Sequence, residues 1–283
     1  MNFRDWCAEP LVDGRHRFDE LPLPALHPLR HGQFALDLTI EQQRITHCRF
    51  DVGASHRGDE KLLEVRDFKQ GLALINRHGW LTSAFAETLY ARIIESAVGI
   101  TISPRVATLR DVVLELNRAA TDEYWRAVDA QLAGTEPSLA RREEILAVLE
   151  RITGARMHTT YVRIGGVAAD ITADDIAAIR GLRIQNVDTA VASLETCTGD
   201  VAVQLPKVLR LPQGEYYDEI LTPHDTLGIW VFSKGDKVPH RVHLRTAGFA
   251  ALAELEIAAM GQRPEDFFKQ LAETRLVIGE VAR

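Results

Sequence analysis

The residues best able to do chemistry in this sequence are histidine, arginine and tyrosine side chains next to apolar runs. His56 and Arg57 precede Gly58, and an apolar pattern of helical period begins directly afterwards. His31 stands beside a glycine at the start of an alternating stretch, and Tyr90 lies on the apolar face of another helical pattern. Imidazole and phenol groups can supply a transferable proton, and a guanidinium carries a fixed positive charge.

These residue types also fit purely structural roles. A histidine beside a glycine at a strand start is typical of a surface or capping position, and a tyrosine on an apolar helix face is typical of a core. His56 and Arg57 are followed by Asp59 and Glu60, so they could also form an ion pair at the start of a helix. Both interpretations are open at this point.

Cysteine spacing limits the metal chemistry. Cys7, Cys48 and Cys197 are far apart and share no CxxC spacing, so neither a zinc site nor an iron–sulfur cluster can be built from them alone. We expect reduced thiols of a cytoplasmic protein. The Gly165-Gly166 pair fits a tight backbone turn better than a phosphate cradle, because no GxGxxG follows a strand pattern.

Composition predicts a globular protein. The chain has 283 residues, 46% of them hydrophobic, which is enough to bury a core. The formal net charge of -7 leaves no basic footprint, so we predict no nucleic-acid partner and no electrostatic binding to membranes. The N-terminus has no apolar segment of the signal-peptide kind, and no run approaches the roughly 20 apolar residues of a membrane span. Membrane association is expected only through partner subunits.

Hydrophobic periodicity gives the expected elements of the first two thirds of the chain. Residues 1–25 contain three prolines and predict an irregular N-terminal arm. Alternating apolar residues predict a hairpin at 32–52. Helical patterns follow at residues 59–75, 81–98, 104–125, 138–153 and 173–182. Ser103, Ser138 and Thr172 are the expected helix caps.

The last third resumes with strands. Alternation on both sides of a turn at 234–237 predicts a second hairpin, and two helices are expected at 247–260 and 264–273, followed by an extended tail. Residues 184–225 give no readable pattern. The order of elements predicts an α+β fold in which a central helical bundle (59–182) is flanked by small antiparallel β-hairpins, within one domain at 26–283.

Several segments carry a resemblance to a known family. They are HPLRHG at 27–32, HRGDEKLLE at 56–64, LELNR at 114–118, ITGARMHTTYVRIGGVAAD at 152–170, LGIWVFSKGDKVPHRVHLRTAGFAAL at 227–252 and the tail IGEVAR. In this order they resemble the D-type, quinone-chamber subunit of proton-pumping NADH:quinone oxidoreductase (complex I), which is itself similar to the large subunit of nickel–iron hydrogenases. The resemblance implies a hydrogenase-large-subunit-like fold.

The resemblance also implies site residues. In the family, the second histidine of the first motif and a tyrosine of the second helix flank the quinone headgroup, so His31 and Tyr90 are the implied catalytic and quinone-binding residues. A quinone carbonyl that gains electrons becomes basic and needs hydrogen-bond donors aimed at it. His56 and Arg57 match positions close to the terminal iron–sulfur cluster of the neighbouring subunit, where their charge favours electron arrival.

Cofactors and partners follow from the same resemblance. Quinone is the implied substrate, and the iron–sulfur cluster belongs to a partner small subunit. The stretches at 76–84 and 273–283, where hydrogenases carry nickel–iron ligands, contain no cysteine, so no nickel–iron site is expected. The chain is then one subunit of a translocase-type NAD(P)H:quinone oxidoreductase, inactive alone. It is held with other peripheral-arm subunits and a membrane subunit at the cytoplasmic face of the plasma membrane.

Three departures from the family are visible. The acid that the family pairs with the quinone histidine falls on Arg141, although Asp129 or Glu143 could replace it after a register shift. The family's final Asp-Arg reads Ala282-Arg283, and the 171–226 region is much shorter than in the family. The sequence therefore indicates a shortened, divergent member. A second hypothesis is a non-catalytic structural or coupling subunit of a hydrogenase-related membrane complex.

Overall fold

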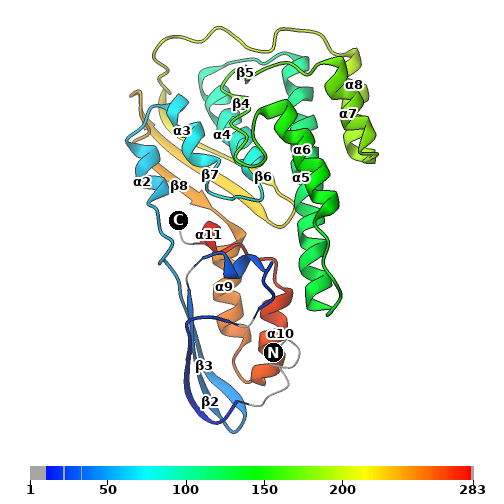
Figure 1. Cartoon of the computed structure of the whole chain (residues 1–283). Coiled ribbons are helices and arrows are strands. Elements are labelled where there is room, and N and C mark those ends of the chain that lie inside the picture. Colours follow the sequence, from blue (N-terminus) through cyan, green and yellow to red (C-terminus); the bar gives the residue numbers. More distant parts are fainter. Residues whose placement is uncertain (1–10, 22, 33, 282–283) are drawn as a thin grey trace. The chain divides into compact units, whose positions relative to one another are not determined.

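The computed structural model describes residues 11–21, 23–32 and 34–281 and divides the chain into two compact units. Unit 1 comprises Met1–Arg57, Tyr124–Ser138 and Thr246–Arg283, and unit 2 comprises Gly58–Glu123 and Leu139–Arg245. Figure 1 shows the course of the chain through both units. The boundary of one domain at 26–283 stays a prediction. Cys7 and the Ala282-Arg283 terminus lie outside the described residues.

Unit 1 contains an antiparallel sheet in the order β1-β2-β3, formed by Gly14–Phe18, Ala35–Glu41 and Arg44–Asp51. The hairpin predicted at 32–52 is therefore confirmed, and its buried face carries the alternating apolar residues. Residues 14–18, expected to be irregular, form a strand. The carboxylate of Asp13 accepts backbone hydrogen bonds from Gln42 and Gln43 at 2.8 and 2.9 Å, which ties β1 to the turn between β2 and β3.

Helices cover one side of this sheet. They are the 3₁₀ turn η1 (Pro28–Arg30), α9 (Ala247–Ala258), α10 (Pro264–Glu273) and α11 (Ile278–Val281). The Phe267 ring contacts the Phe50 ring at 6.4 Å, and Phe268 meets Phe18 edge-on at 5.4 Å. The tail, expected to be extended, contains the single helical turn α11. These contacts close one hydrophobic core within unit 1.

Unit 2 holds most of the predicted helices and one more. The helices are α2 Asp59–Glu64, α3 Phe68–Ile75, α4 Ser83–Val98, α5 Pro104–Leu132, α6 Ala140–Thr153, α7 Ala173–Gly181 and the additional α8 Gln185–Thr196. The helix predicted at 59–75 is two helices, because the Asp67 side chain caps α3 by accepting from the backbone N–H of Gln70. Ser103 and Thr172 cap their helices as predicted, whereas Leu139, not Ser138, is the N-cap of α6. The last part of α5 belongs to unit 1.

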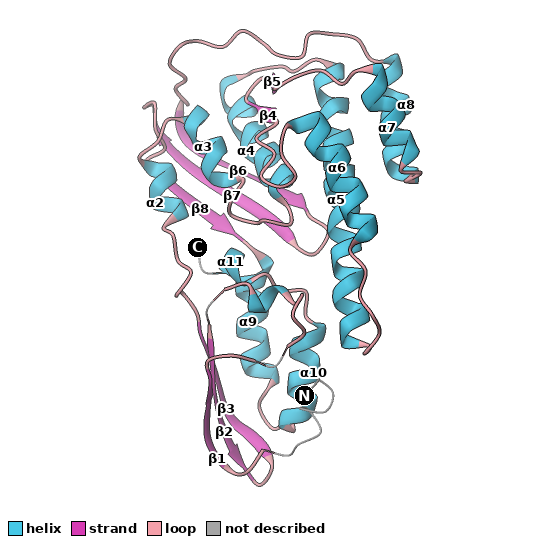
Figure 2. Cartoon of the chain, in the orientation of Figure 1, coloured by secondary structure: helices cyan, strands magenta, loops and turns pink. Residues whose placement is uncertain are grey.

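Two small sheets complete unit 2 (Figure 2). The larger has the order β6-β7-β8, formed by Gln213–Leu221, Thr226–Lys234 and Arg241–Arg245. The hairpin predicted around 234–237 is confirmed as β7 and β8, whereas β6 and α8 come from the region that gave no readable pattern. Helix α4 packs on β6 and β7, and α2 packs on β8.

The smaller sheet pairs β4 (Val162–Arg163) with β5 (Gly166–Val167) across the glycine turn. A buried ion pair fixes this turn, because Arg110 binds Glu95 through two contacts of 2.6 and 2.9 Å. Arg110 also donates to the Gly166 carbonyl at 3.1 Å, and the Gly165 N–H donates to Glu95 at 2.6 Å. The two buried charges are thus paired with each other and with the backbone of the turn.

Among the helices described, none combines the length and the apolar character needed to cross a lipid bilayer.

Candidate functional site

The segment from His27 to His31 is a short turn built into the core of unit 1. Pro28 occupies the first position of η1, and His27 is its N-cap. The His27 ring accepts from the Leu29 N–H at 3.2 Å and donates through Nε2 to the Ala272 carbonyl at 3.0 Å. Burial lowers the pKa of His27 to about 4, with a smaller contribution from the charge of His31. His27 is therefore a neutral anchor that joins η1 to α10.

His31 follows η1 and is exposed, and its imidazole contacts a phenol. Nε2 of His31 lies 3.2 Å from the hydroxyl oxygen of Tyr124, which comes from the last part of α5. The Tyr124 hydroxyl also donates to the Leu26 carbonyl, and the Leu26 N–H donates to the side chain of Gln131 at 3.0 Å. Helix α5 therefore holds the backbone of Leu26 at two points, its carbonyl through Tyr124 and its N–H through Gln131.

Sequence reasoning did not identify Tyr124. It lies 93 residues from His31 and directly precedes Trp125 in an otherwise polar stretch of α5. Two adjacent aromatic residues in a polar run were the only available signal. Trp125 packs edge-on against the ring of His27 at 6.3 Å, so the aromatic pair contacts both histidines of the turn.

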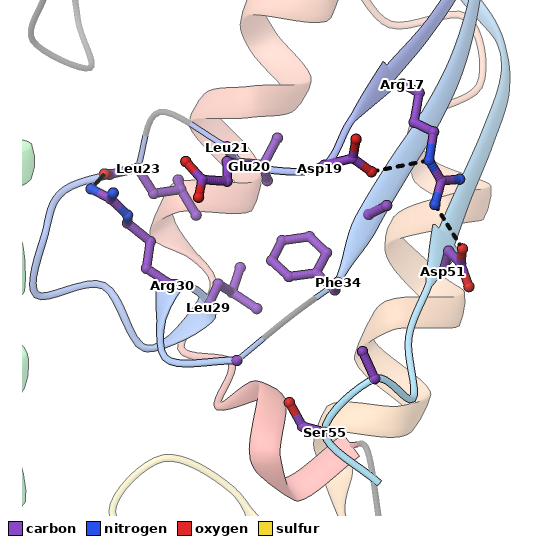
Figure 3. A pocket seen from close by; sticks show the side chains of 13 residues that line it. Arg17, Asp19, Glu20, Leu21, Leu23, Leu29, Arg30, Phe34, Asp51 and Ser55 are labelled. Carbon is purple, nitrogen blue, oxygen red and sulfur yellow. Dashed lines mark hydrogen bonds and ion pairs between the residues drawn. The ribbon is translucent and has the colours of Figure 1, made fainter.

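A cavity of about 700 Å³ borders the same turn within unit 1. Figure 3 shows the apolar side chains of Leu21, Leu23, Leu29 and Phe34 among those that line it. The neighbours of His31 on both sides, Arg30 and Gly32, line it as well, whereas His31 is not one of the lining residues. The cavity thus combines apolar side chains with charged ones, and its volume is in the range of sites for small organic ligands.

Charged residues form one side of this cavity. Arg17 of β1 binds the carboxylate of Asp19 at 3.1 Å and that of Asp51 at 2.9 Å, as drawn in Figure 3. Arg30 donates to the Leu23 carbonyl at 3.1 Å. The guanidinium groups are therefore held by the protein and keep the polar rim of the cavity in place.

Tyr90, the second predicted quinone ligand, is in the core of unit 2. The residue is fully buried in α4, and its hydroxyl has no hydrogen-bond partner among the described residues. Burial raises the pKa of Tyr90 above its usual value. Its hydroxyl packs against Gly71 of α3. His31 and Tyr90 belong to different units.

His56 and Arg57 are exposed and immediately precede α2. Gly58 is the N-cap of that helix in the left-handed conformation, with φ of 68°, which explains a glycine at this position. Asp59 lies 3.5 Å from the buried ring of His78, and Glu60 accepts from the Leu244 N–H at 2.9 Å. These two acids therefore join α2 to the rest of unit 2.

The acids considered as partners of His31 are engaged elsewhere. Arg141, at the position where the resemblance implies an acid, pairs with Glu144 at 2.7 Å. Asp129 pairs with Arg275 at 3.5 Å, and Glu143 pairs with Arg156. Nε2 of His31 contacts the phenol of Tyr124.

Unit 2 contains a second polar centre, which sequence reasoning also missed. The fully buried carboxylate of Glu87 accepts from the backbone N–H groups of three consecutive residues, Thr160, Tyr161 and Val162, at 2.6, 3.1 and 3.1 Å. It also accepts from the Asn76 side chain at 3.0 Å. Burial raises the pKa of Glu87, and these hydrogen bonds oppose the rise. The carboxylate thus fixes the segment that follows His158.

No group of three or more His, Cys, Asp or Glu side chains is arranged to bind a metal ion in the part of the chain that the structure describes.

Comparison with known proteins identifies the family of this chain. Residues 134–201 and 185–283, together more than half of the chain, match the family described as the 49 Kd subunit of respiratory-chain NADH dehydrogenase. The D-type NADH-quinone oxidoreductase subunit numbered 2 of Streptomyces griseus subsp. griseus is 25% identical over 354 residues, covering 90% of this chain and 90% of the relative. The D-type subunit of the same enzyme from Mycolicibacterium smegmatis is 39% identical over 162 residues, which are 55% of this chain and 37% of the relative.

A solved structure shares the fold. A chain in the structure of the membrane-bound sulfane sulfur reductase, an archaeal respiratory membrane complex, aligns with a TM-score of 0.76 and 20% identity. The alignment covers 96% of this chain and 98% of that chain. The sequence matches and the shared mixed fold lead to one conclusion: this chain belongs to the family of the 49-kDa subunit of respiratory-chain NADH dehydrogenase, as a protein like the D-type subunit of complex I.

Proposed function

We propose that this chain is the quinone-binding subunit of a complex I-like, membrane-associated NAD(P)H:quinone oxidoreductase. The observation that carries the proposal is the contact of His31 with Tyr124 on a turn that borders a cavity lined by apolar and charged side chains. A cavity of about 700 Å³ suits a small organic ligand. An imidazole beside it can supply a proton when a quinone oxygen gains electrons.

In this proposal two electrons and two protons convert the quinone to a quinol. The electrons come from the iron–sulfur cluster of a partner subunit, and His31 delivers one proton. Tyr90 is the second predicted donor. His56 and Arg57, which are exposed, are proposed to face the partner's cluster, where a protonatable imidazole and a fixed guanidinium favour electron arrival. The chain itself holds no nickel–iron site in this scheme.

The assembly is part of the proposal. The partners are an iron–sulfur small subunit, other peripheral-arm subunits and a membrane subunit, and the chain is inactive without them. It is held peripherally at the cytoplasmic face of the plasma membrane, in a translocase-type complex. We also propose that its fold is that of a shortened nickel–iron hydrogenase large subunit. The family match and the likeness to a chain of a respiratory membrane complex support this assignment.

One observation favours the alternative, a structural or coupling subunit that binds no quinone. The Tyr90 side chain is fully buried and packs against Gly71, and Tyr90 does not line the cavity described above. A tyrosine in this environment is suited to holding α3 against α4. In this alternative the chain keeps the fold and its contacts with the small subunit but takes no part in proton delivery.

The test uses the assembled membrane complex that contains this chain. We expect His31→Gln to lower kcat for quinone reduction by about 100-fold, the size of a lost general acid, while the complex keeps all its subunits. His47→Gln, on the exposed side of β3, is the matched control and should leave the rate unchanged. Unchanged kcat and KM in an intact His31→Gln complex would reject the quinone role and favour the structural alternative. Tyr90→Phe in the same assay tests the second donor.

A further inference from the structure

The hydroxyl of Tyr124 contacts both the Leu26 carbonyl and the His31 ring, and the first contact fixes the direction of the second. A phenol has a single proton, and the Leu26 carbonyl oxygen can only accept, so the proton of Tyr124 lies toward Leu26. Toward His31 the same oxygen must then accept. The atom that donates to it, 3.2 Å away, is Nε2 of His31, which therefore carries a hydrogen.

We propose that Tyr124 is a positioning residue that holds His31 in the Nε2–H form, so that His31 exchanges protons with its ligand through Nδ1. In a neutral imidazole with a hydrogen on Nε2, the lone pair is on Nδ1. A proton taken up there is passed on without rotation of the ring or exchange between its two nitrogens. The inference rests on the proposed function, since it names the atom of His31 that serves the quinone.

The geometry can persist because each member of the chain of hydrogen bonds is attached to the core of unit 1. The side chain of Tyr124 is buried, with 4% exposure, so water does not compete for its hydroxyl. Leu26 is held through its own N–H by Gln131, and the backbone N–H of His31 donates to the Pro28 carbonyl at 3.1 Å. The ring of Trp125 beside it lies under the guanidinium of Arg275 at 5.6 Å.

A phenol also differs from a carboxylate in what it does to the charge of the site. Both accept a hydrogen bond from Nε2 and fix the ring in the same orientation. A carboxylate adds a full negative charge beside the ring, whereas a phenol whose proton is committed to a carbonyl adds none. Tyr124 thus orients His31 through a neutral group.

The test is long-range ¹H–¹⁵N NMR of the full ¹⁵N-labelled chain at pH 8, with the His31 signals assigned from His31→Gln. We expect an Nε2-bound hydrogen that exchanges slowly with water and an unprotonated Nδ1. His27 is an internal reference, because its Nε2 donates to Ala272 and its Nδ1 accepts from Leu29. In Tyr124→Phe the slow exchange should disappear. Tyr161→Phe, which removes a phenol that donates to Ala169 in unit 2, should leave the His31 signals unchanged.

Two outcomes would overturn the inference: a hydrogen on Nδ1 of His31 in the wild type, or His31 signals that do not respond to Tyr124→Phe. The first outcome is measured on the wild type, so the inference is tested even if the Tyr124→Phe chain fails to fold. In the assembled complex we expect Tyr124→Phe to lower kcat about 10-fold with KM within about twofold. The expected NMR result in a complex that reduces no quinone would reject the proposed function and keep the ring arrangement. A complex that reduces quinone but gives one of the two contradicting NMR results would reject only the positioning role of Tyr124.

Discussion

The phenol oxygen of Tyr90 in α4 lies directly over the backbone of Gly71 in α3. A Cβ atom at Gly71 would collide with this oxygen and would lie 2.7 Å from Cζ of the same ring. A glycine inside a helix costs about 1 kcal/mol relative to alanine, so its presence here needs a packing reason. The absent side chain is what lets the Tyr90 ring fit between the two helices.

Gly71→Ala should therefore destabilise the protein in spite of alanine's higher helix propensity. We expect a loss of about 1 to 3 kcal/mol in the free energy of unfolding, measured by urea denaturation, because the ring has to move. Combining it with Tyr90→Phe should recover part of the loss, since the colliding oxygen is gone. Gly181→Ala is the control, because that helical glycine has open space around it. A neutral Gly71→Ala would contradict the packing described here.

Tyr90→Phe alone should leave stability unchanged or raise it by up to about 1 kcal/mol. The hydroxyl is buried without a hydrogen-bond partner among the described residues, and such a group costs free energy to bury. Tyr161→Phe is the comparison, because its hydroxyl donates to the Ala169 carbonyl at 2.7 Å, and its removal should cost about 1 kcal/mol. If urea midpoints show the larger loss for Tyr90→Phe, its hydroxyl has a partner in solution.

Glu87→Gln should destabilise unit 2 by about 2 kcal/mol at pH 7. Both carboxylate oxygens accept backbone N–H groups, from Thr160 on one oxygen and from Tyr161 and Val162 on the other. In glutamine an NH₂ group replaces one of the two oxygens. In either orientation of the amide, the hydrogens of this group would point at backbone N–H groups, which are also donors. Glu144→Gln, an exposed helix position paired with Arg141, should change stability by less than about 0.5 kcal/mol. Equal effects of the two substitutions in thermal or urea unfolding would argue against this centre.

His27 should make the stability of unit 1 depend on pH. Its pKa is about 4 in the folded chain against 6.5 in the unfolded chain, so the folded state resists protonation of the ring. Above pH 6.5 the ring is neutral in both states and folding is not opposed. As the pH falls from 6.5 toward 4, the unfolded chain takes up the proton first, and the free energy of unfolding falls by about 3 kcal/mol. In urea titrations at pH 7 and pH 4.5, His27→Gln should show a smaller acid destabilisation than the wild type. His47→Gln, an exposed position, should keep the wild-type dependence.

Gly32→Ala should disturb the turn that carries His31. A Cβ at Gly32 would collide with the Ile278 side chain of α11 and lie 3.1 Å from the Ser55 hydroxyl. We expect a loss of about 1 to 3 kcal/mol and a change in the His31 ring signals by NMR. Gly279→Ala, in the same helix α11 but with open space around it, should change neither. An undisturbed His31 signal in Gly32→Ala would show that the turn tolerates the added methyl group.

The elements that the sequence predicted are those whose signals are local. Apolar alternation marks β2, β3, β7 and β8, and helical period together with the caps at Ser103 and Thr172 marks α5 and α7. β6 was missed because its residues alternate only between partly buried and exposed, so none of them gives a core signal. Pairing with β7 makes it a strand, and that pairing is a property of the folded sheet.

The same distinction holds for the site. The amino-acid sequence by itself determined the HPLRHG motif and the family, because these are properties of residues close together in the chain. Only the tertiary structure decided that Tyr124 contacts His31 and that Tyr90 is closed off by Gly71. Each of these contacts depends on how a helix lies against another segment, and no spacing in the sequence records that geometry. A hydrogen bond tolerates errors of only a few tenths of an ångström, which is far finer than a hydrophobic pattern can specify.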